Sequence, residues 1–262
     1  MSEAFYVSVA DVQCIAAAMD SLLISTASGM KARMESLEML ANNLANLSTS
    51  GFKLDRESFS LYASPEAESG NGSNTISQSP ILERHRTDLS QGSLTETGSP
   101  LTVGLSGPGF LRVTKGSDLV YTRNGQLRIG AAGSLETSEG YGLRNRQGKP
   151  IIVDPLQAVD IDRQGIIRQG NHEIGQIDLV AVDNPDQMEK LGATYFMVSP
   201  SASVHSSDAE VRQGYIENSN VNPADASIRL VSVMRQFEML QRAMQLGADM
   251  NRKAIDEVAK VS

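Results

Sequence analysis

Residues 21–47, SLLISTASGMKARMESLEMLANNLANL, carry the pattern that decides the fold. An apolar side chain recurs in this stretch every seven residues, at Leu23, Met30, Leu37 and Leu44. Such spacing is typical of a helix with a coiled-coil-like seam. Asp20 or Ser21 is a suitable N-cap, because its side-chain oxygen can accept a hydrogen bond from a free backbone N–H. We therefore expect a helix over 21–47 that ends in the polar run 48–51.

The other end of the chain repeats this pattern. Asn222 is a good N-cap, and Pro223 suits the first helical position, so we expect a helix over 223–260. Its apolar seam contains Leu230, Val233, Phe237, Leu240 and Met244. Long apolar stripes must be buried. One possibility is that both helices pack on a core of their own chain. We favour the alternative that they pack on each other and on other subunits.

Between the two helices the sequence indicates strands. Short apolar runs are separated by turn residues, at 101–105, 110–113, 119–122, 126–129, 151–153, 166–168, 174–182 and 195–198. Asn124-Gly125 is typical of a two-residue hairpin turn, since glycine adopts positive φ easily. Residues 64–80 are rich in Ser, Gly, Asn, Glu and Pro, which indicates a mobile linker or long loop.

These patterns predict an α+β protein. Long N- and C-terminal helices pair as a coiled-coil-like domain, and a central all-β domain contains many short strands. The predicted domains are an N-terminal extension over 1–18, a helical polymerisation domain over 19–53 with 214–262, a linker and entry segment over 54–98, and a central β domain over 99–213.

Composition and motifs argue against several classes of function. The 262 residues include 23 Lys and Arg against 31 Asp and Glu, and a net charge of -8 disfavours general nucleic-acid binding. No run approaches ~18 consecutive apolar residues, so no membrane-spanning helix is expected. The single Cys14 cannot form an internal disulfide.

Candidate sites for catalysis or ligands are weak. The glycine-rich run 104–109 has the wrong spacing for a nucleotide loop, and 160–165 resembles a calcium loop but lacks its twelfth-position Glu. Both read better as turns between strands. Arg84-His85-Arg86 is a small anion patch or, more simply, a solvated surface. We expect no catalytic residues, no cofactor and no metal. The rivals from other classes are a monomeric β-domain module that binds a small ligand and, less favoured, a hydrolase.

Three sets of motifs carry a resemblance. The first contains Asn43, Leu44, Ala45, Asn46, Thr49, Gly51, Phe52 and Lys53. The second runs through the middle as 107–110, 121–125 and 133–135. The third contains Gly214, Glu217, Ser219, Asn220, Val221 and Asn222, followed by Arg235, Phe237 and Glu238. In this order they resemble the motifs of the bacterial flagellar rod and hook proteins.

The resemblance implies a structural protein that assembles helically with copies of itself and with other rod proteins. Its terminal helices would form a tube around the export channel and transmit torque. Such proteins leave the cell through the flagellar type III export apparatus without a cleaved signal peptide, and reside in the basal body. The short segment after Lys53 favours a proximal-rod type; a distal-rod or hook-type subunit is the alternative. Residues 1–18 precede the usual start of the family, so Met19 is a candidate start.

The motif residues also suggest local roles. Gly51 is expected to end the first helix in a left-handed conformation, with Phe52 packing against the exit. Gly214 is expected to allow a sharp turn from the β domain into the last helix. In a packed tube, the Asn residues are expected to satisfy backbone groups that water cannot reach, unless they are simply polar residues on a helix surface.

Overall fold

The computed structural model describes residues 9–62, 79–116 and 118–261 of the chain. It contains two compact units. The helical unit comprises Met1–Ala41, Glu57–His85 and Ala224–Ser262, and the β unit comprises Asn42–Arg56 and Arg86–Pro223. The predicted α+β class is confirmed by these elements. The predicted polymerisation domain, 19–53 with 214–262, includes parts of both units.

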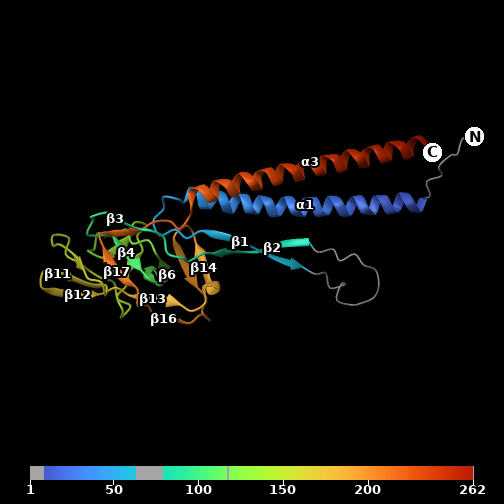
Figure 1. Ribbon diagram of the computed structural model, residues 1–262. Coiled ribbons are helices and arrows are strands. Elements are labelled where there is room, and N and C mark those ends of the chain that lie inside the picture. Colours follow the sequence, from blue (N-terminus) through green and yellow to red (C-terminus); the bar gives the residue numbers. More distant parts are fainter. Residues whose placement is uncertain (1–8, 63–78, 117, 262) are drawn as a thin grey trace, which may run out of the picture. The chain divides into compact units, whose positions relative to one another are not determined.

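Two long helices dominate the helical unit and lie side by side (Figure 1). Helix α1 spans Val9–Ala45 and helix α3 spans Pro223–Val261. Met39 and Leu40 of α1 pack with Val233 of α3, so the late turns of one helix meet the early turns of the other. Further along, a Cβ added at Gly29 would lie 3.6 Å from a side-chain atom of Leu240, an ordinary van der Waals distance, so the two helices are also neighbours there.

The start predicted for α1 is wrong. The helix begins at Val9, and Asp20 and Ser21 lie inside it rather than at its N-cap. The reason is that residues 9–20 contain several alanines and no Gly or Pro, so nothing in this stretch interrupts a helix. The C-terminal end comes at Ala45, two residues before the expected end. The start of α3 at Pro223 is as predicted.

The β unit is built from short antiparallel strands. Its largest sheet has nine strands: β14, β15, β6, β5, β9, β8 and β7 lie in that order, and β13 pairs with β5 and β16. Their bounds are β5 Phe110–Lys115, β6 Asp118–Thr122, β7 Leu127–Ile129, β8 Leu135–Thr137, β9 Gly142–Leu143, β13 Leu179–Val182, β14 Met188–Leu191, β15 Tyr195–Val198 and β16 Val204–Ser206. A 3-10 turn, η1 Pro185–Gln187, precedes β14.

Smaller sheets complete the described strands. A three-stranded sheet contains β10 Asp160–Ile161, β11 Ile166–Gln169 and β12 His172–Gln176. The two-stranded pairs are β4 Val103–Ser106 with β17 Glu210–Gln213, β3 Leu94–Glu96 with β18 Tyr215–Glu217, and β1 Asp55–Tyr62 with β2 Ser79–Thr87. The β1–β2 pair flanks the predicted linker, most of which (63–78) lies outside the described residues.

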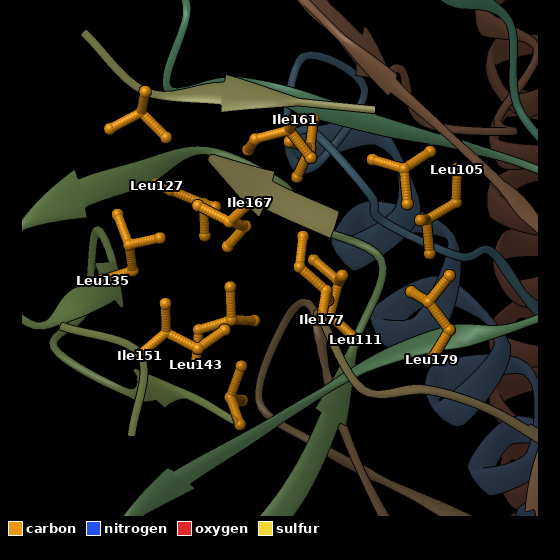
Figure 2. Packing of buried hydrophobic residues seen from close by; sticks show 14 of the residues in the cluster. Leu105, Leu111, Leu127, Leu135, Leu143, Ile151, Ile161, Ile167, Ile177 and Leu179 are labelled. Atoms are coloured by element: carbon orange, nitrogen blue, oxygen red, sulfur yellow. The ribbon is translucent and has the colours of Figure 1, made fainter. Parts of the chain in front are cut away.

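A large apolar core holds much of the β unit together, and a smaller cluster around Phe110 and Phe196 is separate from it. Figure 2 shows leucine and isoleucine side chains from several sheets pointing toward one another, among them Leu105, Leu111, Leu135 and Ile167. These four are fully buried. Each such side chain contributes roughly 1.5–3 kcal/mol by leaving water, so this core supplies a large part of the unit's stability.

The predicted hairpin at Asn124-Gly125 is wrong. Strands β6 and β7 on either side are not neighbours in the sheet, and Gly125 does not have positive φ. Gly125 is needed for another reason: a Cβ there would lie 1.7 Å from the carbonyl oxygen of Val103. The backbone N–H of Val103 also donates to the Gly125 carbonyl at 2.9 Å. The glycine therefore allows two chain segments to touch.

Other strand predictions meet mixed results. Residues 151–153 form no strand and make only an isolated bridge through Ile152, whereas the run 174–182 is split between β12 and β13. The two predicted turns are confirmed over part of their length: 162–165 joins β10 to β11, and 107–109 joins β4 to β5. The first residues of each stretch, 160–161 and 104–106, belong to β10 and β4 instead.

Candidate functional site: a buried clasp between motif residues

The N-terminal motif turns into the β unit after α1 ends. A short series of turns leads to Gly51, whose φ of 70° is left-handed. Gly51 lies six residues beyond the end of α1, so it does not terminate the helix as predicted. Its conformation has a packing reason as well, because an added Cβ would lie 2.4 Å from the backbone nitrogen of Asn124. The Gly51 N–H donates to the Glu217 carbonyl at 2.8 Å.

Three charged side chains meet in the interior of the β unit. Lys53 Nζ lies 2.5 Å from Glu217 Oε1, and Arg123 Nη1 lies 2.9 Å from Glu217 Oε2. The Lys53 and Glu217 side chains are fully buried, and that of Arg123 is nearly so. One residue comes from each of the three motif sets, so residues up to 164 positions apart in the sequence share one ion cluster.

Backbone groups complete the coordination of this cluster. Lys53 Nζ donates to the Ser90 carbonyl at 2.7 Å, and the Gly92 N–H donates to Glu217 Oε1 at 2.9 Å. Arg123 Nη2 donates to the Gly107 carbonyl at 2.6 Å. Removing charges from water is costly unless ion pairing and hydrogen bonds offset the loss. Here most of the donors and acceptors find partners, although Arg123 Nε finds none among the described residues.

Two asparagines tie backbone segments to this cluster. Asn43, on the last turns of α1, both donates to the Asp55 carbonyl at 2.8 Å and accepts from the Asp55 N–H at 3.0 Å. Asn220 accepts from the Leu54 N–H at 2.8 Å and donates to the Asp88 carbonyl at 2.8 Å. Asn43 and Asn220 therefore satisfy backbone groups within a single chain. The role of the motif asparagines in a packed tube stays a prediction.

Lys190 of β14 also binds the segment that contains Lys53 and Asp55. Its Nζ donates to the Lys53 carbonyl at 2.7 Å and to Asp55 Oδ2 at 2.8 Å. It also lies 4.0 Å from the centroid of the Phe52 ring, as expected for a cation–π contact. Phe52 itself is fully buried. Its packing at the helix exit stays a prediction.

We call this group the clasp: Asn43, Gly51, Phe52, Lys53, Asp55, Arg123, Lys190, Glu217 and Asn220. All of its members lie in the β unit. It fastens the segment that follows α1 to the segment that precedes α3 through side chains and single backbone contacts. In the part of the chain that the structure describes, the two segments form no strand ladder with each other.

Burial shifts the protonation of the two lysines. Desolvation lowers the pKa of Lys53 below its ordinary value, although the charge of Glu217 and its hydrogen bond oppose the shift. Burial likewise lowers the pKa of Lys190, against the opposing effect of Asp55. In both cases the carboxylate partner favours the charged form of the lysine, against the effect of burial.

Nothing in the clasp resembles catalytic machinery. Its carboxylates are engaged by cations, and its lysines are hydrogen-bonded to backbone carbonyls. Among the described residues, no group of three or more His, Cys, Asp and Glu is placed to hold a metal ion. Within that same part of the chain, neither long helix has the continuous apolar stretch that a bilayer crossing requires. The arrangement is suited to holding chain segments together.

The remaining motif residues lie elsewhere. Gly214, with φ 78°, joins β17 to β18 and does not lead into α3, so its predicted role is wrong. Asn46 caps the turn after α1 by donating to the Asn42 carbonyl and accepting from Thr49. Arg235 and Glu238 are exposed on α3.

Three of the predicted seam residues contribute to the apolar cluster between the two helices. Val233 is buried, and Leu37 and Leu230 pack around it. The others are half-buried in the single chain: Leu23, Met30, Leu44, Phe237, Leu240 and Met244. Their role in contacts between subunits stays a prediction.

Sequence reasoning missed several members of the clasp. Arg123 was recognised only as part of a strand-and-turn motif, although a lone arginine beside an apolar strand was a usable signal for a buried ion pair. Lys190 and Asp55 carried no such signal, because an isolated charge in a polar stretch usually lies on the surface.

Comparison with known proteins gives these motifs a context. Three family models match in order: "Flagella basal body rod protein" over 24–53, "Flagellar hook protein FlgE/F/G D1 domain" over 104–169 and "Flagellar basal body rod FlgEFG protein C-terminal" over 212–257. The chain is 30% identical over 260 residues to flagellar basal-body rod protein FlgG of Buchnera aphidicola subsp. Schizaphis graminum, covering 89% of this chain and 97% of that protein. The chain belongs to the flagellar basal-body rod protein family.

Other relatives agree with this assignment. Flagellar basal-body rod protein FlgF of Caulobacter vibrioides is 29% identical over 245 residues, covering 93% of this chain and 99% of that protein. Flagellar basal-body rod protein FlgF of Mesorhizobium japonicum is 29% identical over 248 residues, covering 93% of this chain and 99% of that protein. The three family models contain Lys53, Arg123 and Glu217 respectively, so each matched region of this rod-family chain supplies one charge to the clasp.

Proposed function

We propose that this chain is a structural subunit of the flagellar basal-body rod, of the proximal type, which assembles with copies of itself and with other rod proteins into a hollow helical tube. The observation that carries the proposal is its similarity to rod proteins of nearly the same length over almost the whole chain. A distal-rod or hook-type position remains the alternative. In this proposal the assembled tube transmits torque and lines the export channel, and the subunit arrives through the flagellar type III export apparatus without a cleaved signal peptide.

The clasp fits a subunit that carries mechanical load. A force along either long helix reaches the β unit through the residues that follow α1 or precede α3. The buried Lys53–Glu217–Arg123 cluster and the asparagine bonds hold these two segments at one place. Breaking such a cluster leaves charges buried without partners, which is strongly unfavourable. We propose that the clasp keeps the two segments together under load.

A second apolar stripe on α3 supports contacts between copies. Four large apolar residues are each at least 60% exposed: Ile228, Met239, Leu246 and Met250. Ile228 and Leu246 are separated by about five helical turns, with Met239 about two turns before Leu246 and Met250 about one turn after it. Val233 is rotated by ~140° from Ile228 and packs on α1 instead. We call these four residues the outer stripe.

The occupant we propose for the outer stripe is a second copy of this chain. Exposed charges beside the stripe alternate in sign along α3: Arg235, Glu238, Arg242, Asp249, Lys253 and Asp256. A partner of one sign, such as a nucleic acid or an anionic membrane, would be repelled by half of these charges. A shifted or antiparallel copy of the same helix can match each charge with its opposite. In the tube, the half-buried seam residues complete this coiled-coil-like packing.

Sedimentation velocity of the full chain over rising concentration tests the proposal. We expect association that increases with concentration. Leu246→Asp places a charge in the outer stripe and should weaken association about tenfold or more, because an unpaired charge is costly to bury. Gln245→Asp is the matched control, since Gln245 is exposed on the same helix but points away from the stripe. Equal weakening by both substitutions would contradict the proposal. So would a wild type that associates neither by itself nor when it is mixed with other rod proteins.

A further inference from the structure

Half of the outer stripe consists of methionine. Met239 and Met250 are each 60% exposed in the single chain, whereas Met39 of α1 is buried at 8%. Met34 and Met234, elsewhere on the two helices, are 50% and 46% exposed. A thioether is apolar and adaptable, which suits a packed interface between helices. It is also the apolar side chain that mild oxidants convert into a polar one.

We infer that Met239 and Met250 form an oxidation-sensitive site, at which a hydroperoxide converts the outer stripe from an apolar surface into a polar one and prevents a second copy from packing there. This inference rests on the proposed function of the stripe. It assigns to these two side chains a modification, methionine sulfoxide formation, and a consequence, the loss of subunit association.

The chemistry needs only a hydroperoxide. The thioether sulfur attacks the outer oxygen of the O–O bond, so a sulfur–oxygen bond forms while the O–O bond breaks. Sulfur loses two electrons, and the peroxide is reduced to an alcohol, or to water in the case of hydrogen peroxide, after the proton moves to the leaving oxygen. A sulfoxide reductase supplied with a dithiol reverses the change, giving the thioether, water and a disulfide.

The position of the two side chains explains why the change would matter. A sulfoxide oxygen is a strong acceptor, and the other members of the outer stripe, Ile228 and Leu246, are apolar and offer it no donor. The flanking cations Arg242 and Lys253 are the ones that the proposed second copy pairs with its own acidic residues. Water satisfies the oxygen in the free subunit, but packing against an apolar partner removes that water. We expect association to weaken about tenfold or more once both residues are oxidised.

The exposure of each methionine predicts which ones oxidise first, and the proposed packing predicts which ones are protected from peroxide in the assembled state. In the free chain, Met239 and Met250 should oxidise faster than Met39, because peroxide must reach the sulfur. In the assembled state, the partner should cover both residues and slow their oxidation. Met197 on β15 is 45% exposed and lies in the β unit, so its oxidation should proceed at the same rate in both states.

In the test, the full chain is diluted until it is dissociated into single subunits and is then treated with hydrogen peroxide. Mass spectrometry then follows each methionine, and sedimentation velocity follows association after the peroxide is removed. The Met239→Leu/Met250→Leu variant keeps an apolar stripe of similar volume but cannot form a sulfoxide there. Met197→Leu is the matched control in the β unit. Carrying Cys14→Ala in every version excludes oxidation of the single thiol.

We expect peroxide to weaken association of the wild type and of Met197→Leu, and to leave the double-leucine variant unaffected. Treatment with a sulfoxide reductase and a dithiol should restore association of the wild type. Equal sensitivity of the double-leucine variant, or full association after Met239 and Met250 are completely oxidised, would overturn the inference and leave the proposed function standing. Absence of association before any peroxide is added would overturn both.

Discussion

At the scale of single residues, Glu217 is the centre of the clasp because it neutralises two cations. It is the acceptor for both Lys53 and Arg123, and all three side chains are buried or nearly so. Removing the carboxylate leaves two positive charges close together without a counter-ion. Removing Lys53 instead leaves a neutral pair, Glu217 with Arg123. The two substitutions should therefore have different costs.

We expect Glu217→Gln to lower the free energy of unfolding by roughly 3–5 kcal/mol, the usual cost of breaking a buried ion pair. Lys53→Met should cost less, about 1–3 kcal/mol, since it mainly removes hydrogen bonds. The double substitution should cost less than the sum, because only one buried cation then remains. Urea unfolding followed by circular dichroism measures all three, and Glu173→Gln on the exposed strand β12 is the control. Equal costs for the two single substitutions would contradict a shared counter-ion.

Asp88 makes the stability of the same region depend on pH. Burial alone would raise the pKa of Asp88, but hydrogen bonds from Ser90 and the ion pair with Arg56 outweigh it and hold the pKa below the ordinary value of 3.8. A carboxyl with a lowered pKa in the folded state stabilises the protein above its unfolded-state pKa, and this contribution disappears as the pH falls through the folded-state value.

We therefore expect Asp88→Asn to be less stable than the wild type at pH 7 and to approach it in stability below pH ~3.8. The difference at neutral pH should be about 1 kcal/mol or less, because the Arg56 side chain is 61% exposed and solvent screens the pair. Urea unfolding from pH 7 to the acid limit of folding measures it. A difference that stays constant over this range would show that the charge of Asp88 has no role.

At the scale of elements, the long helices were predictable because their signals are local. The seven-residue spacing around Leu37 and the Asn222-Pro223 start both act over a few residues. The start of α1 was missed because a good N-cap residue is also tolerated inside a helix. Strand pairing was less predictable: the Asn124-Gly125 pair suggested a hairpin, whereas Gly125 is set by contact with Val103, a distant residue.

The clasp was the least predictable element, for the same reason. Its motif residues were identified as a group, but nothing in the sequence indicated that Lys53 meets Glu217, which lies 164 residues away. The short turn before Lys53 nevertheless contains a glycine, Gly51, whose importance can be tested by substitution. Gly51 has positive φ and also fills a space that admits no Cβ, so two separate costs should arise there.

Gly51→Ala should lower the stability of the β unit by more than the roughly 1–2 kcal/mol that a left-handed alanine costs. Gly98 provides the matched control, because its φ of 66° is similar and an added Cβ there would meet nothing within 4 Å. The difference between Gly51→Ala and Gly98→Ala isolates the contact with Asn124. Urea unfolding measures both variants, and equal losses would mean that the backbone around Asn124 moves aside.

At the scale of the whole molecule, the two compact units suggest two unfolding transitions that can be followed separately. The helical signal at 222 nm comes mainly from α1 and α3. The near-ultraviolet signal of tyrosine reports on the β unit, which holds Tyr121, Tyr141, Tyr195 and Tyr215. Tyr141 and Tyr195 are stacked with ring centroids 4.2 Å apart, so their signal should be strong while the unit is folded.

Val233→Ala opens a cavity in the small cluster with Met39 and Leu40, which lies entirely in the helical unit. We expect it to lower the thermal midpoint measured at 222 nm and to leave the tyrosine midpoint unchanged. Glu217→Gln should do the reverse, since the clasp lies in the β unit. The reason is that a cost confined to one compact unit lowers the stability of that unit first. Parallel thermal scans at both wavelengths, at a concentration low enough to prevent association, measure the two midpoints. If either substitution shifted both midpoints equally, the two units would unfold as one cooperative structure.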